Sequence, residues 1–202
     1  ADATLKLSKR WSTSLLAHYE NETKAHDGND DGFVDIPQVE QYNVWNRWAY
    51  MGDHYVFQAG IKALSETRTS GQVNHGGTMH SGDLYKVGID TERYEFFTKN
   101  AYIFNKEKNT NLALILSTTL HNQDATYGRK LYNVDQTNVY ASLMFETEFN
   151  PQNSFSAGLS FNYDAYDQHY RLENTTDNPL KAFEKEAVPG AYVQYTLNLN
   201  DK

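Results

Sequence analysis

No cysteine occurs among the 202 residues, so the chain has no disulfide framework and no cysteine nucleophile. It also has no run of about 18 apolar residues, and its mean hydropathy is -0.73, which excludes a membrane-spanning helix. Basic residues form no block, because 18 lysines and arginines are interleaved with 26 aspartates and glutamates, for a formal net charge of -8. Nucleic acid is therefore not expected as a partner.

Motifs for catalysis are missing as well. The chain has no G-x-S-x-G, no H-E-x-x-H and no glycine-rich phosphate loop. We therefore predict that the chain is not an enzyme. A barrel enzyme of the esterase or protease type stays open as an alternative, because abundance alone does not say whether serine, histidine and aspartate meet in the fold.

The chain does contain a repeated alternation of apolar and polar residues. The clearest stretches run over 139–149 and 154–165. In a strand, alternate side chains point to opposite faces, so each stretch has one apolar and one polar face. The stretches are about twice as long as a globular strand of ~5–6 residues, and they match the ~9–11 residues that cross a bilayer. This favours an all-β fold, an antiparallel up-and-down transmembrane β-barrel with about nine long strands. A tyrosine-rich soluble β-sandwich such as a lectin is the alternative.

The same alternation assigns side chains to the two faces. We expect one apolar set to face lipid: Leu143, Phe145, Leu159 and Phe161. We expect the intervening polar set to face a water-filled lumen: Glu146, Ser160 and Asn162. Charged residues keep to the polar parity, as lipid-facing charges would cost about 2–4 kcal/mol each at the midplane.

Connections between the strands are expected to alternate in length. Long polar segments are predicted near 21–41, 70–90, 121–135 and 167–186, and tight turns separate the other strands. Membrane barrels have short turns at one rim and long extracellular loops at the other. We therefore expect the four long segments to share one rim.

Three segments resemble a known family. They read HDGNDDGFVD over 26–35, YNVWNRW over 42–48 and SETRTSGQ over 65–72. They are similar to the barrel of Bacteroidetes-type TonB-dependent outer-membrane receptors, a group that includes siderophore receptors and the vitamin B12 receptor. In that family a 22-stranded barrel encloses an N-terminal plug, and TonB coupling drives uptake of a bound nutrient.

The resemblance implies that residues 1–202 are a segment of such a barrel, without its plug and its C-terminal strands. Its implied location is the bacterial outer membrane. The implied function is capture of an iron-siderophore, haem or cobalamin by extracellular loops, followed by TonB-coupled import. Implied partners are the small-molecule nutrient, outer-membrane lipid, the plug and remaining strands, TonB through the plug, and a surface lipoprotein. A passive porin and a structural or adhesive barrel are the alternatives.

The segment 27–35 also resembles the first half of a calcium loop. Oxygen ligands occupy positions 1, 3, 5 and 9, a glycine occupies position 6, and position 12 is Gln38 where an EF-hand has glutamate. The candidate calcium ligands on the 21–41 loop are Asp27, Asn29, Asp31 and Asp35, with the Phe33 carbonyl. The alternative is a turn rich in Asp, Asn and Gly that needs no metal. His75 and His80 share a glycine-rich segment, which we expect to be a solvated loop.

Overall fold

The computed structural model describes residues 1–73, 84–173 and 179–198. Every regular element in these ranges is a β-strand, and none of these residues forms an apolar helix that could cross a membrane. The strands are β1 (Asp2–Lys6), β2 (Trp11–Glu22), β3 (Gln38–Met51), β4 (Tyr55–Gly71), β5 (Lys86–Asn105), β6 (Thr110–Tyr127), β7 (Lys130–Asn150), β8 (Asn153–Leu172) and β9 (Leu180–Leu197). The predicted all-β fold is confirmed.

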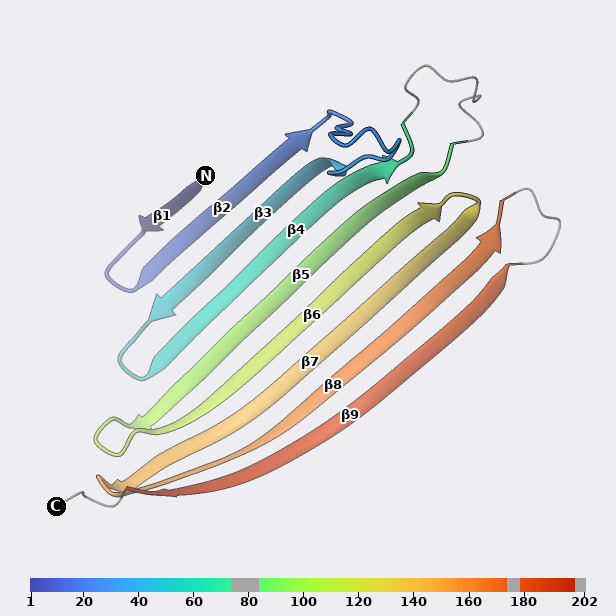
Figure 1. Cartoon of the computed structure of the whole chain (residues 1–202). Helices are drawn as coiled ribbons and strands as arrows, with labels where there is room; N and C mark the ends of the chain where they lie inside the picture. The colour runs from blue at the N-terminus through green and yellow to red at the C-terminus, as the bar shows by residue number, and fades with distance from the viewer. Residues whose placement is uncertain (74–83, 174–178, 199–202) are drawn as a thin grey trace.

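All nine strands belong to one sheet, in the order in which they occur along the chain. Each strand pairs antiparallel with the next, which gives an up-and-down meander that Figure 1 shows as one continuous curved sheet. Strand β7 has 21 residues and β5 has 20, far beyond the ~9–11 needed to cross a bilayer. This is the fold of a β-barrel wall.

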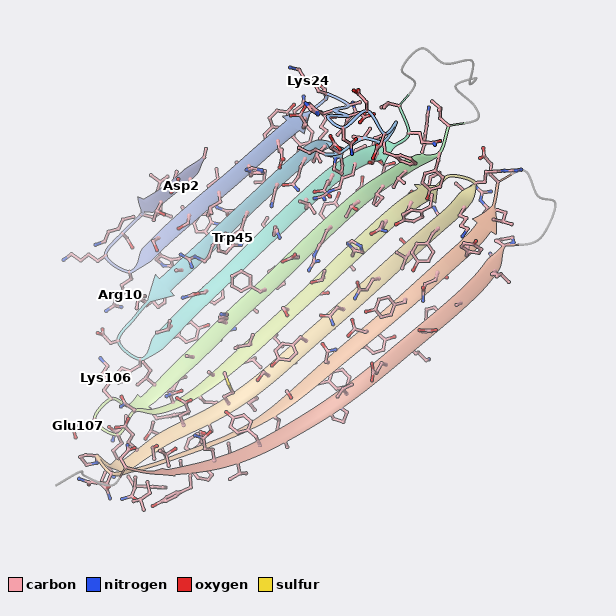
Figure 2. All side chains as sticks on the ribbon, in the orientation of Figure 1. Asp2, Arg10, Lys24, Trp45, Lys106 and Glu107 are labelled. Atoms are coloured by element: carbon pink, nitrogen blue, oxygen red, sulfur yellow. The ribbon has the colours of Figure 1, made fainter. Side chains whose placement is uncertain are left out.

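The connections lie at two opposite ends of the sheet (Figure 1). Figure 2 labels Arg10 and Lys106 at one end and Lys24 at the other. One end carries the short turns 7–10, 52–54, 106–109 and 151–152. The other carries the segment 23–37, the turn 128–129 and the strand ends at Gly71, Lys86, Leu172 and Leu180. The expectation that the four segments predicted as long share one rim is therefore confirmed by the strand ends that flank them. Residues 74–83 and 174–178 lie outside the described residues.

The predicted loop over 121–135 is wrong. Strands β6 and β7 continue through this region and pair up to Tyr127 and Lys130, so the connection is a tight turn at 128–129. Gly128 makes this turn with a φ of 61°, a conformation that glycine adopts without steric cost. Most of 167–186 is likewise strand. These stretches look like loops in sequence because they are polar on both faces, and strict short-long alternation fails at this turn.

The described sheet has no second layer packed against it. Among the described residues Ala125 is the one hydrophobic side chain that is buried, at 3% exposure, while Ile61 is 60% exposed and Leu159 61%. Contiguous apolar surface of this extent is rare on soluble monomers. The two faces of the sheet must therefore be covered by different surroundings.

Candidate functional site

The outer face of the sheet is an apolar band. Its rows run across the strands by register, and one such row is Ile61, Phe96, Thr118, Val139 and Tyr163. The parity predicted for β7 and β8 is confirmed, because Leu143 pairs with Leu159, and Phe161 and Phe145 lie in the adjacent rows of the same face.

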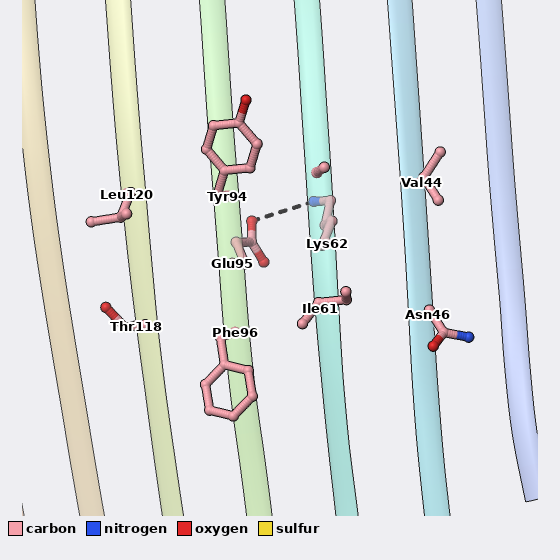
Figure 3. Close-up of a pocket in the computed structure, with 10 residues that line it drawn as sticks. Val44, Asn46, Ile61, Lys62, Tyr94, Glu95, Phe96, Thr118 and Leu120 are labelled. Atoms are coloured by element: carbon pink, nitrogen blue, oxygen red, sulfur yellow. Dashed lines mark hydrogen bonds and ion pairs between the residues drawn. The ribbon is translucent and has the colours of Figure 1, made fainter.

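A shallow apolar hollow of about 380 Å³ lies on this band between β3 and β6. Figure 3 shows Tyr94 and Phe96 beside it. Lys62 and Glu95 form an ion pair and belong to the opposite face of the sheet. The hollow suits a hydrocarbon chain and offers little to a polar ligand. Its apolar lining is Val44, Ile61, Ala63, Tyr94, Phe96 and Leu120.

Aromatic rings border the band at both ends. Near the short turns, the ring of Trp11 lies 5.1 Å from Tyr50 and 6.2 Å from Phe57 between centroids. Near the other end, the ring centroids of Tyr19 and Tyr42 lie 4.9 Å apart. Tyrosine and tryptophan have an apolar body and a polar tip, which suits the boundary between hydrocarbon and water.

Carboxylates mark where the band ends. Glu92, Asn122, Asp135 and Asp167 form one outward-facing row just beyond it. From Val139 to Phe149 on β7 the outer face stays free of charge. These ten residue steps, at a rise of about 3.3 Å and a tilt of about 40°, give a height of about 25 Å, the size of a transmembrane apolar band.

The inner face is mainly polar. On β7 most of its side chains are half-buried, whereas half of the outer-face side chains are exposed. Ser142 pairs with Ser160 and Tyr140 pairs with Asn162, and Glu146 lies on the same face of β7. The predicted grouping of Glu146, Ser160 and Asn162 on one face, opposite to the apolar set, is therefore confirmed.

Charge is divided across the inner face. Strands β3 to β5 carry its cations around one half-buried carboxylate: Glu95 lies 3.4 Å from Lys62 Nζ and 2.7 Å from Arg93 Nε. The Arg47 guanidinium lies 5.6 Å from the centre of the Trp45 ring. Strands β8 and β9 carry acids instead: Asp164, Glu184 and Glu186.

Three amide side chains stabilise the Asp164 carboxylate. Asn162 Nδ2 donates to it at 2.6 Å, Asn138 Nδ2 at 2.9 Å and Gln136 Nε2 at 3.2 Å. No cation takes part in this network among the residues the structure describes. The inner faces of β6 and β7, between the basic and acidic strands, carry amides and hydroxyls such as Ser117, Thr119 and Asn138, together with the apolar Ile115 and Met144.

Nearer the long-loop rim, Glu66 and Arg68 form a two-point ion pair on β4. Arg68 Nε lies 2.5 Å from one Glu66 oxygen and its terminal nitrogen 3.0 Å from the other, and Gln41 donates a further hydrogen bond. The Arg68 hydrogen bonds, followed by that of Gln41, lower the pKa of Glu66 although burial opposes the shift. Ser65, the preceding residue, pairs with Glu92, so this pair lies beyond the apolar band.

A hollow of about 350 Å³ opens on the inner face of β6 to β9. Tyr132 donates a hydrogen bond to Gln168 at 2.7 Å, and Gln136 donates one to Tyr166 at 2.9 Å. Sequence analysis missed this hollow because its β6 and β7 residues fall in a segment predicted as a loop. No pattern in the sequence separates this segment from a loop, because it is polar at both parities. The lining is His121, Gln123, Tyr132, Val134, Gln136, Tyr166, Gln168 and Glu184.

Comparisons with known proteins address the fold. No family model matches the chain, and no curated protein matches it. The crystal structure of the ferric yersiniabactin uptake receptor FyuA from Yersinia pestis matches with a TM-score of 0.57 and 11% identity. The two share a β-barrel wall. The match covers 96% of this chain and 33% of that receptor, so the chain spans about a third of its length.

The segment proposed to bind calcium forms a compact loop held by its own backbone. Asp27 accepts hydrogen bonds from the amides of Asp31 at 3.2 Å and Gly32 at 2.8 Å, and Asp35 accepts one from Gly28 at 2.6 Å. These bonds span four to seven residues and close the loop on itself.

Asn29 and Asp31 form Asx turns, in which a side-chain oxygen accepts a hydrogen bond from the amide two residues on. Asn29 accepts a hydrogen bond from the Asp31 amide at 3.2 Å, and the Phe33 amide donates to Asp31 at 2.9 Å. No group of three or more His, Asp or Glu side chains is placed to hold a metal ion anywhere in the described ranges. Calcium binding stays a prediction, and it would require these carboxylates to exchange backbone donors for the ion. His75 and His80 lie outside the described residues.

Proposed function

We propose that this chain is part of the barrel wall of a bacterial outer-membrane receptor that imports a small-molecule nutrient, and that it is not an enzyme. The observation that carries the proposal is the division of one sheet into two faces. The outer face has an uncharged band about 25 Å high with aromatic borders, which is the pattern of lipid-exposed barrel walls. The inner face is predominantly polar and carries the ion pairs and amide networks, as a water-filled lumen requires.

A receptor is favoured over the alternatives by two independent likenesses. The sequence segments 26–35, 42–48 and 65–72 resemble TonB-dependent receptors, and the fold resembles part of a solved uptake receptor. We propose that the parent protein completes a 22-stranded barrel, that a plug fills it and that TonB acts through the plug. Its ligand would be an iron-siderophore, haem or cobalamin, with a surface lipoprotein as an additional partner.

Uptake by the intact parent protein tests the proposal. Deletion of its gene should abolish growth when one of these nutrients limits growth, and the intact gene should restore it. Growth should also require TonB. If the purified parent protein instead forms an open, ion-conducting channel in planar bilayers and its loss affects no nutrient, it is a passive porin.

A further inference from the structure

We propose that the hollow on the inner face of β6 to β9 binds a ligand whose contacting surface is uncharged and rich in hydroxyl or amide groups. The inference rests on the proposed receptor function and specifies the chemistry that this part of the lumen recognises. In the following paragraphs, "the hollow" means the cavity lined by His121, Gln123, Tyr132, Val134, Gln136, Tyr166, Gln168 and Glu184.

The first argument is the position of the hollow. His121, Gln136, Tyr166 and Glu184 are successive register partners in one inner row. The next inner row toward the long-loop rim contains Gln123 and Gln168. Both rows lie at the height where the outer face changes from apolar to acidic residues. The hollow is therefore near the outer end of the lumen, where a ligand that enters past the long-loop rim first meets the wall.

The second argument is unused hydrogen-bonding capacity. The side chains of Gln123 and Glu184 form no hydrogen bond or ion pair with any described residue. His121 Nδ1 is buried and has no hydrogen-bond partner within the described ranges. Gln168 uses its carbonyl oxygen to accept from Tyr132, which leaves its amide donors free. Gln123 is half-buried and Glu184 is exposed, so these two side chains and the Gln168 amide are open to a ligand that supplies matching donors and acceptors.

The third argument is charge. No lysine or arginine lines the hollow, and its one carboxylate is Glu184. The nearest cation in the row of His121 is Arg93, whose guanidinium already lies against Glu95. An anionic ligand would meet Glu184 without a compensating cation, which disfavours it. Amides, phenols and an imidazole instead offer mixed donors and acceptors that match hydroxyl and amide groups.

Direct binding to the intact receptor, purified in detergent, tests the proposal. The probes are maltoheptaose as a neutral hydroxyl ligand, cyanocobalamin as a neutral amide-bearing ligand, and ferric citrate as an anionic complex, each titrated to millimolar concentration by calorimetry. We expect a neutral probe to bind, and the replacement of both Gln123→Met and Gln168→Met to weaken it about 10-fold, as the loss of two hydrogen bonds predicts. Which neutral probe binds distinguishes a hydroxyl-rich from an amide-rich ligand.

Thr137→Val is the matched control, since this residue follows Gln136 on β7 but faces outward. It should leave binding unchanged, and circular dichroism should show all variants folded. Binding of ferric citrate alone, or neutral binding that the double variant leaves intact, overturns the assignment while the receptor function stands. Binding of none of the three probes overturns the assignment, and the growth experiment above tests the receptor function separately.

Discussion

Arg10 donates a hydrogen bond to Asp53 at 2.8 Å and so links two neighbouring short turns. Lys106 Nζ, from the next turn along the rim, lies 3.8 Å from the other Asp53 oxygen. One carboxylate thus connects three consecutive hairpins at the end of the sheet that carries the tight turns.

Removal of this charge should have a small effect. Arg10 and Asp53 side chains are 55% and 69% exposed, and exposed ion pairs contribute about 0–1 kcal/mol. We expect Asp53→Asn to lower the free energy of unfolding of the barrel by less than about 1 kcal/mol. Urea unfolding in lipid vesicles measures this change. A loss of several kcal/mol would mean that the three turns fold as one cooperative unit.

A charge placed in the apolar band should be costly. Leu116 lies on the outer face of β6, in the row that includes Ala141 and Phe161. We expect Leu116→Arg to destabilise the barrel in vesicles by about 2–4 kcal/mol, because the guanidinium would face hydrocarbon.

The matched control for this substitution is on the same strand. Thr119 lies on the inner face of β6 and pairs with Glu95, so Thr119→Arg would place its cation toward water and a carboxylate. It should cost less than the Leu116 variant by at least about 1 kcal/mol. Equal costs would show that the two faces do not meet different solvents.

Stability should depend on pH through Glu66. Arg68 and Gln41 hold its pKa below the unfolded value of about 4.3, so the unfolded chain binds the proton more tightly. The contribution of Glu66 is therefore present in full above about pH 4.3 and is lost as pH falls through its folded pKa. We expect the difference in unfolding free energy between wild type and Glu66→Gln to shrink between neutral pH and pH 3. A difference that is constant over this range would contradict the ion pair.

Calcium should order the 23–37 loop if the ion replaces the backbone donors of its carboxylates. Calcium added to the intact receptor should bind with a Kd of about 10⁻⁴–10⁻³ M, and protection of the loop from hydrogen exchange should increase. Asp31→Ala combined with Asp35→Ala should abolish both effects. Equal calcium binding by wild type and the double variant would identify the segment as a solvated turn.

The sequence predicts strand pairing and side-chain faces where one face is apolar. The alternation around Leu143 and Leu159 specifies both parity and register, because a slip of one residue would exchange the two faces. The sequence also predicts tight turns at the opposite end of the sheet, although it misses the one at 128–129. These features depend on local periodicity, which a single sequence contains.

Elsewhere the pattern fails for a physical reason. Between Gln123 and Val134 the strands rise above the apolar band, so both faces meet water and polarity no longer distinguishes strand from loop. The hollow could not be predicted for a further reason. Gln136 and Tyr166 meet only because two segments distant in sequence pair in the sheet. The hydrogen bonds that hold the carboxylates of Asp27 and Asp35 also depend on the path of the loop.

The extension of β6 and β7 beyond the apolar band has a consequence for binding kinetics and entropy. Residues 121–136 are held by continuous backbone pairing up to the turn at Gly128. A ligand that contacts this part of the wall meets side chains on an already rigid support, so little conformational entropy is lost on binding. Recognition there should resemble a fixed template, with fast association and no slow phase of loop closure.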